Sequence, residues 1–171
     1  AEAGASVVGV DFTPEMLTHA ERKKHAITAR SIPAFAHGDA LHLPVRPAAA
    51  DVCTVAFGIR NVSDRRAALR EMARVTRPGG RVLVLEFTMP PGRILGPAYR
   101  FYFTRLLPGV GRLISRDSDA YSYLPRTVMA WPSPTAFQRE MEEEGLEQCG
   151  HRLLTRGIAC LHWGRVPGGP G

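Results

Sequence analysis

Residues 51–87 read DVCTVAFGIRNVSDRRAALREMARVTRPGGRVLVLEF, and they indicate the fold class. Two short apolar runs, 51–57 and 81–87, are typical of parallel strands that are buried on both faces. Between them, Ser63 is the expected N-cap of a helix over about 64–76, which the RPGG turn then ends. A strand, a helix and a second strand in this order predict a βαβ unit in a parallel, doubly wound sheet.

The residues before this unit repeat the same alternation. Residues 5–11 (ASVVGVD) predict another buried strand, which ends on Asp11. Thr13 and Pro14 suit the cap and the first position of the helix that follows. Residues 33–39 (PAFAHGD) predict a short strand, so strands and helices alternate through the first half of the chain.

The last part of the chain predicts an antiparallel ending to the sheet. A helix is expected between Ser133, as its N-cap, and Gly145, where the chain needs a positive φ. Phe137 is expected on its inward face. Two apolar runs follow at about 146–154 and 157–164 with a very short link between them. So short a connection joins antiparallel strands.

Residues 89–131 interrupt the alternation of strands and helices. This segment holds six arginines and two aspartates, so it contributes +4 to the net charge of +6, and it holds all four tyrosines of the chain. We interpret 1–171 as one domain in which 89–131 is a helical cover over the substrate and 167–171 is a disordered tail. The cover segment, 89–131, is thus expected to be an insertion and not another strand–helix unit.

Composition narrows the classes of function. The chain has 171 residues, of which 44% are hydrophobic and 22% charged, as is typical of a globular domain. The three cysteines form no CxxC pair, and His37, Asp39 and His42 are interpreted as solvated loop residues in preference to metal ligands. No nucleic-acid motif accompanies the positive charge, so no nucleic-acid partner is expected. Because no apolar run reaches transmembrane length, the expected location is the cytoplasm.

Acidic and polar residues follow the predicted parallel strands, at the edge where doubly wound sheets bind ligands: Asp11, Asp39, the segment 56–61 and Glu86. A carboxylate at a strand end commonly accepts from ribose hydroxyls, and one in a G-D-A loop can accept from an adenine amino group. The alternatives are a helix cap for Asp11, a turn residue for Asp39, and for Glu86 either a substrate contact or a helix cap. The set predicts an adenosine-containing cofactor, either a nicotinamide dinucleotide or S-adenosylmethionine. The antiparallel ending favours S-adenosylmethionine.

Four segments carry a more specific pattern. They are HGDALHLPV (37–45), AFGIRNVSDRRAALREMARVTRPGGRVLVLEF (56–87), DSDAYSYLP (117–125) and LLTRGIACLH (153–162). In that order they resemble the C-methyltransferases of quinone biosynthesis, which methylate demethylmenaquinol or a ubiquinol precursor. Many class I methyltransferases share RPGG, whereas FGIRN together with D-x-D-A-Y-x-Y-L-P is highly specific. The resemblance covers residues 5–164.

The resemblance implies an α/β fold of the class I S-adenosylmethionine-dependent methyltransferases, a Rossmann-like sheet with a C-terminal antiparallel strand pair. In that family, a first strand and a Gly-rich cofactor loop precede the position that corresponds to Ala1. The strand lies between the strands that correspond to 5–11 and 51–57. We therefore expect a sheet that is split between these two strands. We also expect this chain to be inactive by itself, because the glycine loop is absent from it.

The same resemblance implies the cofactor-binding residues. Asp11 matches the ribose-binding acid, and Asp39 with Ala40 matches the pair on the adenine side. Ala56 stands where some members have a serine that touches the cofactor, so that side-chain contact is lost.

The implied reaction is attack of an electron-rich ring carbon on a sulfonium methyl group, which needs no metal ion. Arg60 is the candidate for stabilising the phenolate, or for orienting a water molecule that removes the proton, because its guanidinium is a permanent cation with forked donors. Its alternative roles are pairing with Asp64 and capping a neighbouring carbonyl. Asn61 either braces the turn or contacts the substrate. Tyr121 and Tyr123 either face the quinol ring or stack within the cover segment.

Together these residues predict S-adenosylmethionine-dependent C-methylation of a prenylated quinol, with demethylmenaquinol to menaquinol as the first choice. The alternatives are the same fold acting on another small acceptor, such as a sterol or phenol, and a non-catalytic partial chain that serves as a scaffold. The arginines and aromatic rings of the cover segment predict contact with the prenyl tail or with the inner face of a membrane. A homo-oligomer is left open.

Overall fold

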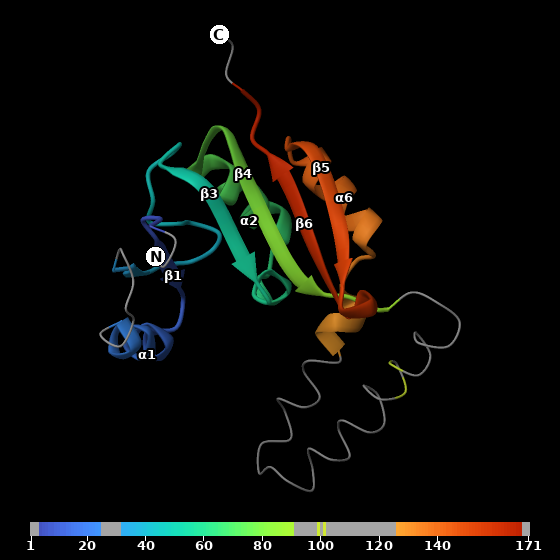
Figure 1. Ribbon diagram of the computed structural model, residues 1–171, viewed down its shortest axis with the longest axis horizontal. Coiled ribbons are helices and arrows are strands. Elements are labelled where there is room, and N and C mark those ends of the chain that lie inside the picture. The colour runs from blue at the N-terminus through green and yellow to red at the C-terminus, as the bar shows by residue number, and fades with distance from the viewer. Residues whose placement is uncertain (1–3, 25–31, 91–98, 100, 102–125, 169–171) are drawn as a thin grey trace, which may run out of the picture.

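The computed structural model describes residues 4–24, 32–90, 99, 101 and 126–168, which form two separate sheets (Figure 1). The strands, in chain order, are β1 (Val8–Asp11), β2 (Ala34–His37), β3 (Ala50–Ala56), β4 (Thr76–Phe87), β5 (Glu147–Leu154) and β6 (Ala159–Arg165). The helices are α1 (Pro14–Lys24), α2 (Arg65–Val75) and α6 (Pro134–Glu143), with the 3-10 turns η1 (Ile59–Asn61) and η3 (Thr155–Gly157). Residues 126–130 are also helical.

The larger sheet has the strand order β3-β4-β6-β5. β3 and β4 are parallel and are connected through η1 and α2, as the sequence predicts. β6 runs antiparallel to both β4 and β5, and η3 connects it to β5. The predicted α/β sheet with a C-terminal antiparallel strand pair is therefore confirmed.

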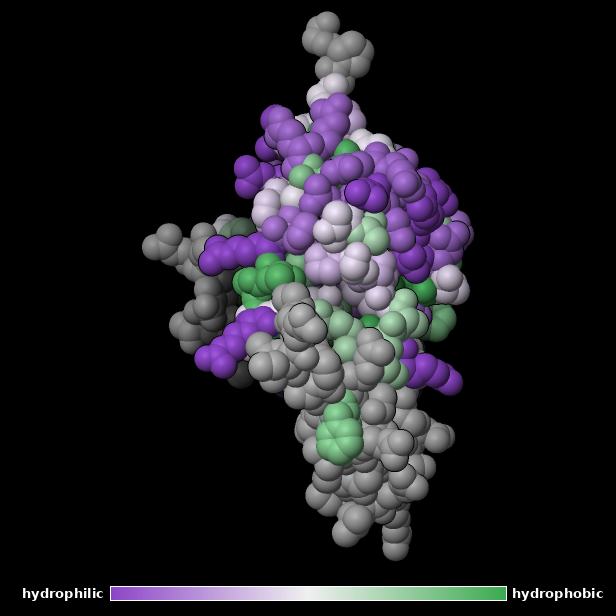
Figure 2. Space-filling view, turned by 90° about the vertical axis from the view of Figure 1, so that its right-hand side faces the viewer, coloured by the Kyte–Doolittle hydropathy of each residue, from purple (hydrophilic) through white to green (hydrophobic). Residues whose placement is uncertain are grey.

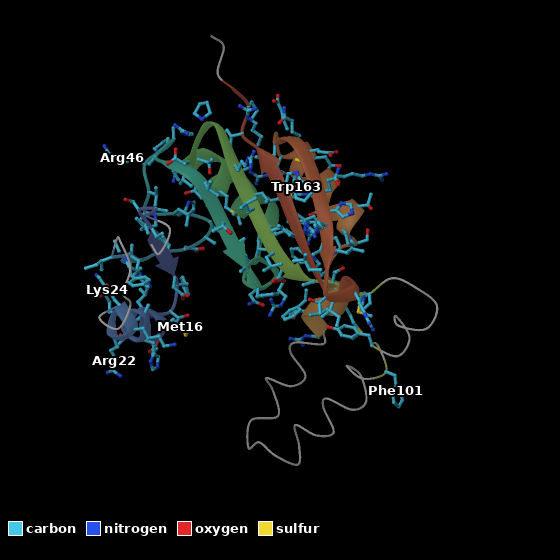
Figure 3. All side chains as sticks on the ribbon, in the orientation of Figure 1. Met16, Arg22, Lys24, Arg46, Phe101 and Trp163 are labelled. Atoms are coloured by element: carbon cyan, nitrogen blue, oxygen red, sulfur yellow. The ribbon has the colours of Figure 1, made fainter. Side chains whose placement is uncertain are left out.

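The smaller sheet consists of β1 and β2, which are parallel and share no ladder with the larger sheet. β1 and β3 are therefore both edge strands, and the expected split between 5–11 and 51–57 is observed. Apolar side chains on these strands are exposed, Val8 at 59% and Val52 at 48%. No residue of α1 is buried, and Met16 and Lys24 lie on its outside (Figure 3).

Helix α2 begins one residue later than the sequence predicts. Its N-cap is Asp64, whose Oδ1 accepts the N–H of Ala67 at 2.9 Å. Both serine and aspartate suit an N-cap, but a carboxylate adds a favourable interaction with the positive end of the helix dipole. The prediction that Ser63 is the cap is therefore wrong.

Strand β4 is longer than predicted, because it starts at Thr76 and contains the RPGG segment. Thr76 is extended directly after α2, and its Oγ1 donates to the carbonyl of Met72 at 2.7 Å. The helix thus ends before the glycines, and the prediction that RPGG ends it is wrong. Gly80 is needed for close approach instead, since a Cβ there would lie 2.8 Å from the carbonyl oxygen of Asp51.

Helices α2 and α6 pack on the same face of the larger sheet, where the core lies (Figure 1). Successive residues of β4 alternate between faces, so Glu86 follows Val82 and Val84 to the buried side. The predicted inward residue Phe137 is fully buried, as is Met141. The core face of β4 is therefore the face on which α2 and α6 pack.

Ion pairs join α2 to α6 at the periphery of the core. Arg65 donates through Nε and Nη2 to the two carboxylate oxygens of Glu140, each at 2.6 Å. Arg66 and Arg70 both contact Glu144. Figure 2, which turns the right-hand side of Figure 1 toward the viewer, shows hydrophilic residues over much of the described surface there. Because the arginines are partly exposed, each pair contributes on the order of 0–1 kcal/mol.

His162 of β6 is a buried core residue, with none of its surface exposed. Its Nε2 donates to the carbonyl of Pro134 at 3.1 Å, and its ring packs edge-on against Phe137. Within the described residues, Nδ1 has no hydrogen-bond partner. A charged imidazole would be poorly solvated here, so burial lowers the pKa of His162 from 6.5 to about 4.

We expect acid to destabilise the protein through His162. Between pH 6.5 and pH 4 the unfolded chain binds the proton more readily, so this contribution is complete above pH 6.5 and is lost as the pH falls to 4. The advantage of the wild type over His162→Gln in free energy of unfolding should shrink by roughly 3 kcal/mol across this range. Urea unfolding at a series of pH values measures it. A difference between the two proteins that is constant with pH would contradict the prediction.

Candidate cofactor and substrate site

The carboxyl ends of the parallel strands carry the predicted site residues. Asp11 is the last residue of β1, and Asp39 comes two residues after β2. Ala56 is the last residue of β3, and Glu86 lies one residue before the end of β4. In open α/β sheets, ligands bind outside these strand ends. The structure therefore places all four residues at the kind of edge that the sequence predicts.

Asp11 is partly exposed and makes a turn between β1 and α1. Its Oδ1 accepts the N–H of Thr13 at 2.8 Å, in a short turn that precedes α1. The ladder aligns Asp11 with His37, whose Nε2 donates to the carbonyl of Phe12 at 3.0 Å. The carboxylate is thus held in one orientation, and its second oxygen can still accept a ribose hydroxyl.

Asp39 begins a loop that joins the smaller sheet to the core. Its Oδ1 accepts the N–H of Leu41 at 2.9 Å, while Ala40 and Leu41 pack against the main hydrophobic cluster. Further along, the N–H of Leu43 donates to Glu71 of α2 at 2.7 Å. The turn role of Asp39 is therefore realised, and the loop brings Ala40 to the core that supports η1.

The end of β3 holds an unusual backbone conformation. Phe57 has φ 56°, in the left-handed region, although it is not a glycine. Its N–H donates to the carbonyl of Leu85 at 2.9 Å, and its ring lies 4.4 Å from that of Phe87. A residue with such a strained backbone persists only where the surrounding structure holds it in that conformation. Here it turns the chain from β3 into η1.

Arg60 and Glu86 form a buried ion pair across the ends of β3 and β4. Nη1 of Arg60 lies 2.7 Å and 3.1 Å from the two carboxylate oxygens of Glu86, and it also donates to the carbonyl of Phe57 at 2.6 Å. The side chains are 10% and 0% exposed. Burial raises the pKa of Glu86 from 4.5 to about 6, against the opposing effect of Arg60.

This pairing corrects one predicted alternative. Arg60 does not pair with Asp64, whose carboxylate caps α2. The other alternative, capping of a carbonyl, is realised at Phe57. Glu86 likewise caps no helix and instead binds Arg60. The sequence did carry a signal for the pair, because a lone carboxylate inside the apolar run 81–87 requires a nearby cation.

The remaining predicted residues are placed only in part. The N–H of Asn61 donates to the carbonyl of Gly58 at 3.0 Å, which braces the η1 turn. Tyr121 and Tyr123 lie outside the described residues, as does most of the cover segment. In the part of the chain that the structure describes, no cluster of three or more His, Cys, Asp or Glu side chains could hold a metal ion. Nor is any helix there long and apolar enough to cross a membrane.

The fold is that of the class I S-adenosylmethionine-dependent methyltransferases. The solved structure of Haemonchus contortus phosphoethanolamine N-methyltransferase 2 with S-adenosyl-L-methionine matches with a TM-score of 0.66 and 14% identity, over 95% of this chain and 43% of that one. A SAM-dependent methyltransferase from Aquifex aeolicus matches with a TM-score of 0.62 and 17% identity, over 94% of this chain and 69% of that one. At such identities these matches support the fold alone.

Sequence comparison is more specific. The model of the ubiE/COQ5 methyltransferase family matches residues 1–166. A demethylmenaquinone methyltransferase of Thermus thermophilus is 47% identical, over 96% of this chain and 73% of the relative. One from Mycobacterium tuberculosis is 42% identical, over 98% of this chain and 68% of the relative. The chain belongs to the ubiE/COQ5 methyltransferase family.

The hydrogen-bond acceptors at this edge fit the adenosine part of the cofactor. Asp11 and Asp39 each use Oδ1 for a backbone N–H, which leaves Oδ2 to accept from a ribose hydroxyl or an adenine amino group. Ala56 is exposed at the end of β3 and offers no polar side chain there, as expected from the sequence. Asp11, Asp39 and Ala40 stay the predicted residues for the nucleoside.

We expect Asp11→Asn to weaken cofactor binding by about tenfold or more, because a neutral amide accepts a hydroxyl less strongly than a carboxylate does. Calorimetric titration with S-adenosylmethionine measures the dissociation constant. Asp51→Asn is the matched control, since Asp51 lies at the opposite end of β3 and pairs with Arg77 at 2.9 Å. Equal dissociation constants for Asp11→Asn and Asp51→Asn would remove Asp11 from the cofactor site.

Proposed function

We propose that this protein transfers a methyl group from S-adenosylmethionine to a ring carbon of a prenylated quinol, converting demethylmenaquinol to menaquinol. Relatives at 40–47% identity are named demethylmenaquinone methyltransferases, which supports this substrate class. The observation that carries the proposal is the buried guanidinium of Arg60 beside the rings of Phe57 and Phe87 at the cofactor edge. A cation next to aromatic surface suits a quinol whose oxygen becomes negative as the ring is activated.

The chemistry needs only a modest contribution from the protein. When bound, the cofactor supplies a methyl group whose bond to sulfur breaks with both electrons staying on sulfur, as a neutral thioether. The quinol supplies the electron pair for the new carbon–carbon bond. Its phenolic proton leaves as the ring is activated and is regained once the ring proton has passed to water, so one proton is released in all. Arg60 stabilises the negative oxygen through its N–H donors. Phe57 and Phe87 offer apolar surface that limits the access of water to the ring.

Turnover of a short-tailed demethylmenaquinol in the presence of S-adenosylmethionine tests the proposal. The enzyme produced in its native host should form the ring-methylated product and S-adenosylhomocysteine in equal amounts. A phenol or a sterol offered alone should give neither product. Methylation of those acceptors but not of the quinol would favour the alternative small-acceptor function. Cofactor binding without methylation of any acceptor would favour the scaffold function.

We expect Arg60→Lys to lower kcat by about 10²–10³, the usual effect of losing one oxyanion donor. Lysine keeps the charge but loses the planar fork, so the dissociation constant of S-adenosylmethionine should stay the same. Steady-state kinetics with the quinol measure kcat. Arg65→Lys is the control because Arg65 pairs with Glu140 between two helices. If Arg60→Lys retains kcat, or changes only cofactor affinity, Arg60 is not catalytic.

A further inference from the structure

Glu86 is an unusual residue to find at the centre of this fold. It lies in the central strand β4, none of its surface is exposed, and it shares the core face with Val82 and Val84. An isolated ionised carboxylate in such a place costs several kcal/mol unless it is paired. Among the described residues it has one cationic partner, Arg60, which approaches with a single nitrogen.

This contact fixes Arg60 through one nitrogen of its guanidinium, Nη1. Nη1 meets three acceptor oxygens, two from Glu86 and one from Phe57. The guanidinium carbon also lies 5.4 Å from the centre of the Phe87 ring. Nε, in contrast, is buried and has no acceptor among the described residues. A buried N–H without a partner is rare in a folded protein, and here it belongs to the residue best suited to bind an oxyanion.

We propose that Glu86 is a positioning residue for methyl transfer, which clamps Nη1 of Arg60 and so fixes the guanidinium whose remaining N–H groups bind the oxygen of the reacting quinol. The inference rests on the proposed function, because it requires an acceptor oxygen at Arg60. Glu86 does not touch the substrate in this arrangement and acts through Arg60. Fixing the guanidinium before the reaction spares the cost of orienting it in the transition state.

Energetics favour this role over a purely structural one. Well-packed apolar residues in place of a buried ion pair are often neutral or stabilising, so stability alone does not require Glu86. Both carboxylate oxygens face the same nitrogen of Arg60, so the pair leaves the other N–H groups of the guanidinium unoccupied by Glu86. What the pair secures is the direction of the guanidinium at the end of β3.

The pair should respond to pH through Glu86. Two further titratable groups share this face of β4 and β6, Cys160 and His162. Burial raises the pKa of the Cys160 thiol and lowers that of His162 to about 4, so both are neutral at pH 6 and Arg60 supplies the local charge. The pKa of Glu86 is about 6, so its carboxylate holds Arg60 above that pH and releases it as the pH falls below.

Glu86→Gln tests the inference in the cofactor-loaded enzyme with a short-tailed demethylmenaquinol. We expect kcat to fall about tenfold, the dissociation constant of S-adenosylmethionine to stay unchanged, and the fall of kcat below pH 6 to disappear. Glu140→Gln removes the carboxylate from another arginine pair, Arg65–Glu140, and should leave kcat and its pH profile as in the wild type. In an Arg60→Lys background, Glu86→Gln should add little, because its effect passes through Arg60.

Each result decides the point. Wild-type kcat and pH profile in Glu86→Gln would overturn the positioning role, as would a full tenfold loss in the Arg60→Lys background. If Glu86→Gln unfolds, as far-UV circular dichroism would reveal, Glu86→Asp takes its place. It keeps the charge but retracts the carboxylate, so kcat should fall while a pH limb remains, and an unchanged kcat would overturn the role. If the wild type does not methylate the quinol, the proposed function itself fails, whereas a failure of the positioning role alone leaves that function intact.

Discussion

The buried carboxylate of Glu86 imposes a constraint from which the arrangement of the site follows. A charge with no exposed surface must be paired, and Arg60 is the cation within reach among the described residues. Meeting it requires β3 to turn sharply into η1, which Phe57 does with a left-handed φ. The same turn places the carbonyl of Phe57 on Nη1. One ion pair therefore fixes where β3 ends relative to β4, and with it the edge at which a ligand binds.

A second constraint acts on the other side of the larger sheet. Parallel strands are normally paired and covered on both faces, yet β1 and β3 each have one open edge. Val8 of β1 and Val52 of β3 are apolar side chains that remain exposed to solvent on these strands. Trp163 is likewise 37% exposed on the face opposite α2 and α6 (Figure 3). Hydrogen bonds join the loop after β2 to α2: the N–H of Leu43 donates to Glu71, and Nη2 of Arg74 donates to the carbonyl of Leu43. They help to connect the smaller sheet to the core.

Sequence reasoning predicted what depends on local pattern and missed what depends on long-range contact. The apolar run 81–87 and the short link between β5 and β6 were enough for the order and direction of those strands. Ser63 and Asp64 both suit an N-cap by residue type, so their adjacent positions in the sequence did not decide which of them caps α2. The Arg60–Glu86 pair joins residues 26 apart on different elements, and no periodicity encodes it. Asp11 and Asp39 were found because strand ends are readable, whereas their roles in the cofactor site stay predictions.

The charge of the site explains why an arginine can work there together with a sulfonium cofactor. Like charges repel, so a lone positive charge at Arg60 would oppose binding of a cationic methyl donor at the same edge. Paired with Glu86, Arg60 adds no net charge to the edge at which Asp11 and Asp39 also lie. In the proposed arrangement, the N–H groups of Arg60 that Glu86 leaves unoccupied bind the quinol oxygen as it becomes negative. In the proposed reaction, the ion pair therefore lets Arg60 attract a negative oxygen without adding a net positive charge that would repel the cofactor.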